Sequence, residues 1–220
     1  MQSWGCIIDP SLFSVITADV IGSRKIGSFS EQRDFKLDLV SKVHLEKHLI
    51  LSPYAVTAWD EFQVILSSPE HTPRVIFDLR RLFVPFALRI AVGMGNASGT
   101  DRQPINLYAG GQAFERARIA ADRLKSESPK YRVFTSFESG NEKFDTIANT
   151  IYHLQDSLLE RRTRKQWATI NLQLETGSQE LTSQRLGVDI STVSRNLKRG
   201  YYWHFVETIE VMQRIFQMCF

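Results

Sequence analysis

The run Gln179–Arg199, QELTSQRLGVDISTVSRNLKR, contains two short helical patterns separated by turn-forming residues. Gly187 follows the first pattern, and because it lacks a side chain it permits a left-handed turn. Val188 is expected to anchor the connection, and Asp189 is placed to cap the second helix. This order of residues predicts a helix-turn-helix.

Apolar side chains at helical spacing give the two predicted helices a common interior. Leu181 and Leu186 are expected to face inward from the first helix. Val193 and Leu197 stand four residues apart, so they share one face of the second helix and point back at the first. The pattern therefore leaves the opposite face of the second helix free for a partner.

That opposite face carries short hydroxyl groups and long cations, which are side chains that reach base edges and phosphates. Residues 161–199 contain eight Lys or Arg against three acids, a local net charge of +5, whereas the whole chain has a net charge of +3. Double-stranded DNA is therefore the expected partner; the alternative is a helical hairpin that only packs on its neighbours. The candidate DNA-binding residues are Ser191, Thr192, Ser194, Arg195, Lys198 and Arg199.

Further helices are predicted on both sides of this pair. Polar, turn-forming residues at Glu138–Lys143 (ESGNEK) indicate a boundary between two domains, residues 1–140 and residues 141–220. Beyond this boundary the patterns predict helices over residues 145–160, 163–176 and 202–218.

The last of these helices is apolar over a wide arc. Such an arc suits a helix that is buried against another domain or a second subunit. Because helix-turn-helix proteins usually bind DNA as dimers, we expect a homodimer built in part on this helix. The arc comprises Trp203, Val206, Ile209, Met212 and Phe216.

The first part of the chain alternates short β-rich runs with longer helical patterns. The order strand, helix, strand, strand, helix, strand, helix, strand is the split βαβ, ferredoxin-like plan with an added helix and strand. We therefore expect an α+β fold, in which a ferredoxin-like antiparallel sheet domain precedes an all-α helix-turn-helix domain. The strands are predicted over residues 12–20, 54–59, 62–66, 86–94 and 131–137, and the helices over 28–51, 73–83 and 112–125.

Two local features of this part carry specific expectations. Ser30 is a plausible cap for the first long helix. The run 93–99 (GMGNASG) is rich in glycine, which is more typical of a strand exit than of a phosphate-binding loop. The apolar positions at helical spacing in the first long helix are Phe35, Leu39 and Val43.

Two acidic positions stand out in this plan. Asp19 ends the first strand, and Asp60 lies in the predicted hairpin. Because the first strand and the hairpin are neighbours in a split βαβ sheet, we expect the two carboxylates to lie close together. Such a pair can hold Mg²⁺ for phosphoryl chemistry, since hard cations prefer oxygen ligands. The alternative is that Asp60 and Glu61 are only turn residues.

Four longer segments carry a family resemblance: ADVIGSR (18–24), WDEFQVIL (59–66), LRIAVGMG (88–95) and AGGQAFERAR (109–118). They resemble the corresponding blocks of the SatD family, a bacterial group whose members often end in a similar helix-turn-helix. The resemblance covers nearly the whole chain. The same blocks are more distantly similar to class III nucleotide cyclase and GGDEF diguanylate cyclase domains, which implies a cyclase-like N-terminal domain.

The cyclase resemblance implies roles for individual residues. In those domains an Asp at the end of the first strand and an Asp in the hairpin bind the metals, which implies that Asp19 and Asp60 do so here. Glu61 and Phe62 match the end of the GGDEF signature. Trp59 stands where cyclases have a Gly that lets the backbone approach the nucleotide closely. The nucleotide-binding residues that the resemblance implies are Gly22, Ser23, Arg24, Trp59, Glu61 and Arg118.

These patterns together predict a DNA-binding transcriptional regulator whose cyclase-like N-terminal domain senses a nucleotide or a metal, with Mg²⁺ as the implied cofactor. Two alternatives stay open: a cyclase-type enzyme with a two-Asp Mg²⁺ site, and an assembly scaffold with a vestigial pocket. Trp59 distinguishes the enzyme from the other two functions. A regulator or a scaffold tolerates a tryptophan at this position, whereas a cyclase needs an explanation for it. The cyclase helix that supplies Asn and Arg reads here as Glu115 and Arg118.

Composition sets the outer limits of these predictions. A chain of 220 residues, 43% hydrophobic and 23% charged, can form one large or two small globular domains. Cys6 and Cys219 stand at opposite ends, which excludes a disulfide framework and a Cys-rich zinc module. The sequence contains no run of about 18 apolar residues, and its first residues lack the basic and then apolar segments of a signal peptide. We therefore expect a cytoplasmic protein without a membrane partner.

Overall fold

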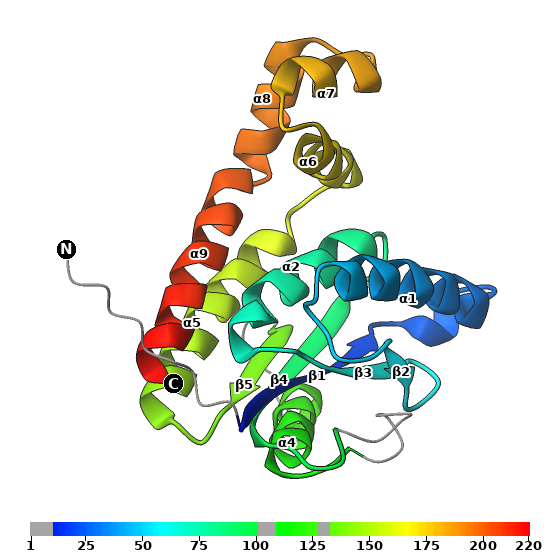
Figure 1. Ribbon diagram of the computed structural model, residues 1–220. Coiled ribbons are helices and arrows are strands. Elements are labelled where there is room, and N and C mark those ends of the chain that lie inside the picture. Colours follow the sequence, from blue (N-terminus) through cyan, green and yellow to red (C-terminus); the bar gives the residue numbers. More distant parts are fainter. Residues whose placement is uncertain (1–10, 101–108, 127–132) are drawn as a thin grey trace.

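The computed structural model describes residues 11–100, 109–126 and 133–220. Cys6 and the start of the strand predicted from residue 131 lie outside these ranges. The N-terminal part forms a five-stranded sheet with the strand order β2-β3-β1-β4-β5 (Figure 1). Its strands are β1 (Leu12–Val20), β2 (Ala55–Val56), β3 (Glu61–Ile65), β4 (Leu88–Asn96) and β5 (Thr135–Glu138).

The sheet is mixed, so the prediction of an antiparallel sheet is wrong at one edge. Strand β1 pairs antiparallel with both β3 and β4, and β2 pairs antiparallel with β3. Strand β5 pairs parallel with β4. The cause is helix α4 (Gln112–Ser126), which lies between β4 and β5 in the chain and crosses over β4, so that β5 runs in the same direction as β4.

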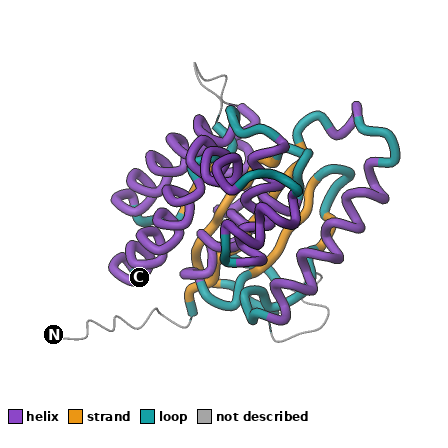
Figure 2. Tube along the Cα trace, turned by 90° about the horizontal axis from the view of Figure 1, so that it is seen from above, coloured by secondary structure: helices purple, strands orange, loops and turns teal. Residues whose placement is uncertain are grey.

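Helices cover both faces of the sheet, and the view from above shows several of them crossing the strands (Figure 2). Among the described helices, α4 covers one face, whereas α1, α2 and α5 pack on the other (Figure 1). The short 3₁₀ turns η1 (Ser23–Lys25) and η2 (Pro69–His71) precede α1 and α2. The helices of this second face are α1 (Phe29–Glu46), α2 (Thr72–Leu82) and α5 (Glu142–Leu159).

Alternation along the strands separates the two faces. On β1, Ile16 and Ala18 enter the main hydrophobic core with α1, α2 and α5, while Val15 packs against α4. Helix α4 approaches β4 closely because Gly93 has no side chain: an added Cβ would lie 2.0 Å from the backbone nitrogen of Ala117. Gly93 lies within β4, as the strand predicted over residues 86–94 implies, and β4 ends at Asn96, inside the run 93–99 that was expected to be a strand exit.

The buried face of α1 differs from the predicted one. Phe35 is 71% exposed and Leu39 is exposed too, whereas Phe29, Leu37 and Val40 are buried. The helix turns these three residues toward the sheet and α2, so two of the three predicted positions face outward and the third, Val43, is half-buried. The predicted cap is also misplaced, because α1 begins at Phe29, one residue before Ser30.

The C-terminal region is all-helical within the described residues. After α5 the chain forms α6 (Arg164–Thr176), α7 (Gln179–Leu186), α8 (Ile190–Arg199) and α9 (Tyr202–Cys219). Helices α6, α7 and α8 lie at the end of the molecule farthest from the sheet, and the long helix α9 returns along α5 (Figure 1).

Helices α5 and α9 share the main core with the sheet. Phe144 and Tyr152 of α5 and Met212 and Phe216 of α9 are buried in it. The domain boundary after residue 140 stays a prediction, although α5 begins just beyond it and packs on β5. Among the described residues, no helix is both long and apolar enough to span a membrane.

Candidate functional site

Helices α7 and α8 occupy the segment predicted as a helix-turn-helix. Helix α7 ends at Leu186, and Gly187 follows with φ 63°, the left-handed conformation expected of it. Helix α8 begins at Ile190 after the extended residue Asp189. Asp189 stands at the N-cap position of α8, as predicted, but its carboxylate makes no capping hydrogen bond.

The interior of this unit is only partly the predicted one. Val193 and Leu197 are fully buried with Ile170 of α6, and Leu186 packs against the same cluster. Leu181, in contrast, is 47% exposed. Helix α7 turns Thr182 toward α6 instead, where its hydroxyl lies 2.8 Å from that of Thr176 and donates to Gln173 Oε1 at 3.2 Å.

The connection between α7 and α8 also differs from expectation. Val188 was expected to anchor it, but its side chain is exposed, as is that of Ile190. The backbone holds the connection instead, because the Val188 N–H donates to the Ser183 carbonyl at 3.1 Å. A main-chain hydrogen bond therefore fixes the connection between α7 and α8, in place of the expected apolar contact of Val188.

The outer face of α8 presents the predicted polar residues. Ser191, Ser194, Arg195, Lys198 and Arg199 are exposed, and Thr192 is half-buried. Within the described part of the chain, the three cations of this face form no ion pair, so their charges are free to meet phosphates. Asn196, which sequence reasoning missed, points inward and donates to Thr169 of α6 at 3.1 Å.

The predicted metal ligands lie at neighbouring positions of the sheet. Arg89 donates to Asp19 Oδ2 at 3.0 Å, and Ser23 Oγ donates to Asp60 Oδ2 at 2.8 Å. The Val20 N–H donates to the Asp60 carbonyl at 3.0 Å, which joins the hairpin to the end of β1. Burial raises the pKa of Asp19 despite Arg89, and the nearby charge of Asp60 raises it further. Each carboxylate therefore already has a polar partner.

The loop after β1 holds three predicted nucleotide-binding residues. Gly22 has φ 74°, a conformation that favours glycine, and it precedes η1. Ser23 is buried and directed at Asp60, whereas Arg24 is exposed. The loop thus places one hydroxyl toward the acidic hairpin and leaves one cation on the surface.

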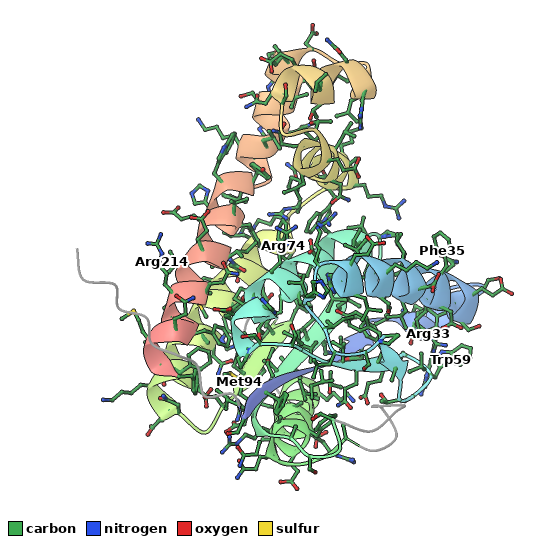
Figure 3. The ribbon with its side chains drawn as sticks, viewed as in Figure 1. Arg33, Phe35, Trp59, Arg74, Met94 and Arg214 are labelled. Carbon is green, nitrogen blue, oxygen red and sulfur yellow. The ribbon has the colours of Figure 1, made fainter. Side chains whose placement is uncertain are left out.

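Trp59 packs on the first turns of α1. Its ring centroid is 5.8 Å from that of Phe29, the Arg33 guanidinium donates to its carbonyl, and the side chain is 59% exposed. Arg33 and Trp59 lie together beside one end of α1 (Figure 3). Because more than half of the side chain is exposed, the indole remains accessible to solvent.

Glu61 and Arg118 line a separate cavity of about 430 Å³ between α4 and the strands β1 and β3. Glu61 accepts from Lys125 Nζ at 3.1 Å and from Thr57 Oγ1 at 2.9 Å. Asp19, Asp60 and Trp59 are outside its lining. The predicted nucleotide-binding residues therefore do not line one cavity: Gly22, Ser23 and Arg24 lie in the loop after β1, Trp59 packs on α1, and Glu61 and Arg118 line the cavity.

Sequence reasoning missed the partner of Asp19. Arg89 stands directly opposite Asp19 in the pairing of β1 with β4, 70 positions away along the chain. The signal is the register of two strands, which one sequence does not reveal. Across the residues that the structure describes, no three His, Cys, Asp or Glu side chains are grouped to hold a metal ion.

Comparison with known proteins places the chain in a family. The model of the SatD family matches residues 13–208, from β1 into α9. A search of curated proteins found no match. Because the family match covers most of the chain, the protein belongs to the SatD family.

Proposed function

We propose that the protein is a DNA-binding transcriptional regulator that reads duplex DNA with helix α8. The observation that carries this proposal is the outer face of α8, where three cations and two serines are exposed and the cations form no ion pair within the described ranges. A helix of this kind fits the major groove, which is about 12 Å wide.

The packing behind α8 supports the same proposal. Val193 and Leu197 fix the helix on α6, and Asn196 ties it to Thr169. Phe205 of α9 and Phe77 of α2 join the same cluster. A reading helix needs such a rigid base, because the position of its side chains decides which bases they reach.

Substitutions on α8 test this proposal. Arg195→Ala should weaken binding of the full chain to its preferred duplex by about 1–3 kcal/mol if the guanidinium reads a base. Lys198→Ala should weaken binding to all duplexes similarly and reduce the slope of log affinity against log salt by about one. Fluorescence anisotropy at several salt concentrations measures both effects.

Lys42→Ala is the matched control, since Lys42 is an exposed lysine of α1 that pairs with Asp38. It should leave DNA affinity unchanged. A wild-type protein that binds no duplex in a salt-dependent way would remove the DNA-binding proposal.

For the N-terminal part we propose a ferredoxin-like, cyclase-related domain that senses Mg²⁺ together with a nucleotide. The order β2-β3-β1-β4, with α1 and α2 on one face, supports the ferredoxin-like interpretation. Asp19 and Asp60 supply oxygen ligands at adjoining positions, and the raised pKa of Asp19 indicates that a cation there would relieve unfavourable charge. Cyclase-type turnover and a scaffold role are the alternatives.

Thermal unfolding tests this second proposal. A ligand held only by the folded form at 100 times its Kd stabilises that form by about 2.7 kcal/mol, so Mg²⁺ with a nucleoside triphosphate should raise the Tm. Asp19→Asn combined with Asp60→Asn should abolish the rise, while the exposed control Asp38→Asn should keep it. An unchanged wild-type Tm would leave only the scaffold role for this part, and released pyrophosphate would favour the enzyme.

We further propose that the regulator is a homodimer. Met212 and Phe216 of the predicted apolar arc are buried in the chain itself, but Trp203 remains exposed on α9, together with Val211 and Met218. Light scattering should give about twice the 25.3 kDa mass of one chain. A mass of one chain at concentrations that saturate DNA would contradict the dimer.

A further inference from the structure

Arg162, in the link between α5 and α6, is buried without a polar partner. Its side chain has three nitrogen atoms, and none of them meets a hydrogen-bond acceptor in the described parts of the chain, although the residue is only 9% exposed. Its guanidinium lies 4.2 Å from the ring centre of Trp167 and 4.2 Å from that of Phe205. The two aromatic rings hold the cation in place but accept none of its hydrogen bonds.

Such an arrangement is unfavourable for the free protein. A buried charge requires a counter-charge or hydrogen-bond acceptors, and ring contacts compensate it only in part. Burial, together with the nearby charge of Arg80, lowers the pKa of Arg162 to about 9. Since Arg80 is already paired with Asp156, the excess positive charge belongs to Arg162.

Arg162 lines a cavity of about 280 Å³. The walls come from the end of α2 and the loop before β4, from the end of α5 and from the start of α6. Most of these walls are apolar, and Phe86 and Trp167 provide aromatic surface. Arg80 and the exposed Arg164 are further cations of the lining. Glu160 also lines the cavity and has interactions of its own.

We propose that this cavity binds a small organic anion whose carboxylate or phosphate pairs with Arg162 and whose apolar body lies against Phe86 and Trp167. A guanidinium presents a planar fork of donors that matches both oxyanions. The volume is at the lower edge of the roughly 300–1,000 Å³ of small-molecule sites, so an anion with one ring or one branched chain fits best.

The position of the cavity gives the anion a route to the rest of the molecule. Trp167 belongs to α6, on which α7 and α8 pack, whereas Arg80 and Phe86 belong to the sheet part. An anion would therefore contact both parts at once. An effect on DNA affinity would follow only under the proposed DNA-binding function; binding itself does not depend on that function.

Calorimetry and thermal unfolding of the full chain without DNA test the site. Benzoate and phenyl phosphate are the probes, and benzamide is the neutral probe of the same shape as benzoate. At least one anion should bind and raise the Tm at millimolar concentration, and benzamide should do neither. The anion that binds with the higher affinity shows whether the site prefers a carboxylate or a phosphate. Benzamide binding as well as benzoate, or no wild-type response to either anion, would overturn the proposal.

Variants of Arg162 separate the proposed contact from general salt effects. Arg162→Met keeps an apolar side chain of similar length between the rings and should weaken anion binding roughly 10- to 100-fold. Arg162→Lys keeps the charge without the planar fork and should bind with intermediate affinity. Arg161→Met, an exposed neighbouring control, should bind like the wild type. Wild-type affinity in Arg162→Met would overturn the proposal.

Discussion

Gly93→Ala is expected to destabilise the fold by about 3 kcal/mol or more, a large share of the 5–15 kcal/mol that stabilises a typical domain. A Cβ at this position would lie 2.0 Å from the Ala117 nitrogen and 2.1 Å from the Ala113 carbonyl oxygen. Both atoms belong to the backbone of α4, so no side chain can rotate away. The helix must move off β4 and lose the contacts of Ala113 and Ala117.

Urea denaturation followed by circular dichroism measures this effect. Gly27→Ala is the matched control, because nothing lies within 4 Å of a Cβ there. It should change the free energy of unfolding by less than about 0.5 kcal/mol. A Gly93→Ala protein with the wild-type midpoint would mean that α4 does not rest on Gly93.

Local patterns predicted the elements better than their faces. The run of β-branched and apolar residues over Leu12–Val20 predicts β1 with the bounds that it has, because such a continuous run is typical of a buried strand. The helix that begins at Phe29 was expected, but its exposed Phe35 was assigned to the core. Apolar residues occur on both sides of α1, so their spacing does not decide which side meets the sheet.

Contacts between distant segments could not be read from the chain. The sequence shows Gly93 only as one glycine in a glycine-rich run, since its importance depends on which helix crosses β4. Asp19 was recognised as a candidate ligand, but its pairing with Arg89 depends on strand register. Arg162 was one of eight cations that gave residues 161–199 their charge, and only the structure reveals that it is buried.

Asp156→Ala is expected to destabilise the fold by about 3–5 kcal/mol, because it leaves a buried cation without its partner. Asp156 is fully buried on α5 and accepts from Arg80 Nη2 at 2.7 Å. The Phe134 N–H donates to it at 2.8 Å and Thr135 Oγ1 at 3.1 Å. One carboxylate thereby joins α5 to α2 and to the start of β5.

Asp156→Asn should cost less than Asp156→Ala. Burial raises the pKa of Asp156 despite the charge of Arg80, so the ion pair does not fully offset the cost of burying the carboxylate. The amide removes that charge and keeps one oxygen as an acceptor. Asp38→Ala, which removes an exposed ion pair with Lys42, is the control and should change the unfolding free energy only slightly.

A double substitution tests whether the buried cations act on one another. In Asp156→Ala, Arg80 keeps its charge beside Arg162, whose own pKa is lowered in part by Arg80. The loss of unfolding free energy caused by Asp156→Ala should therefore be smaller in an Arg162→Met background, where this repulsion is gone. Equal losses of unfolding free energy in the two backgrounds would mean that Asp156 compensates the charge of Arg80 alone. The charge of Arg162 would then be stabilised only by the rings of Trp167 and Phe205.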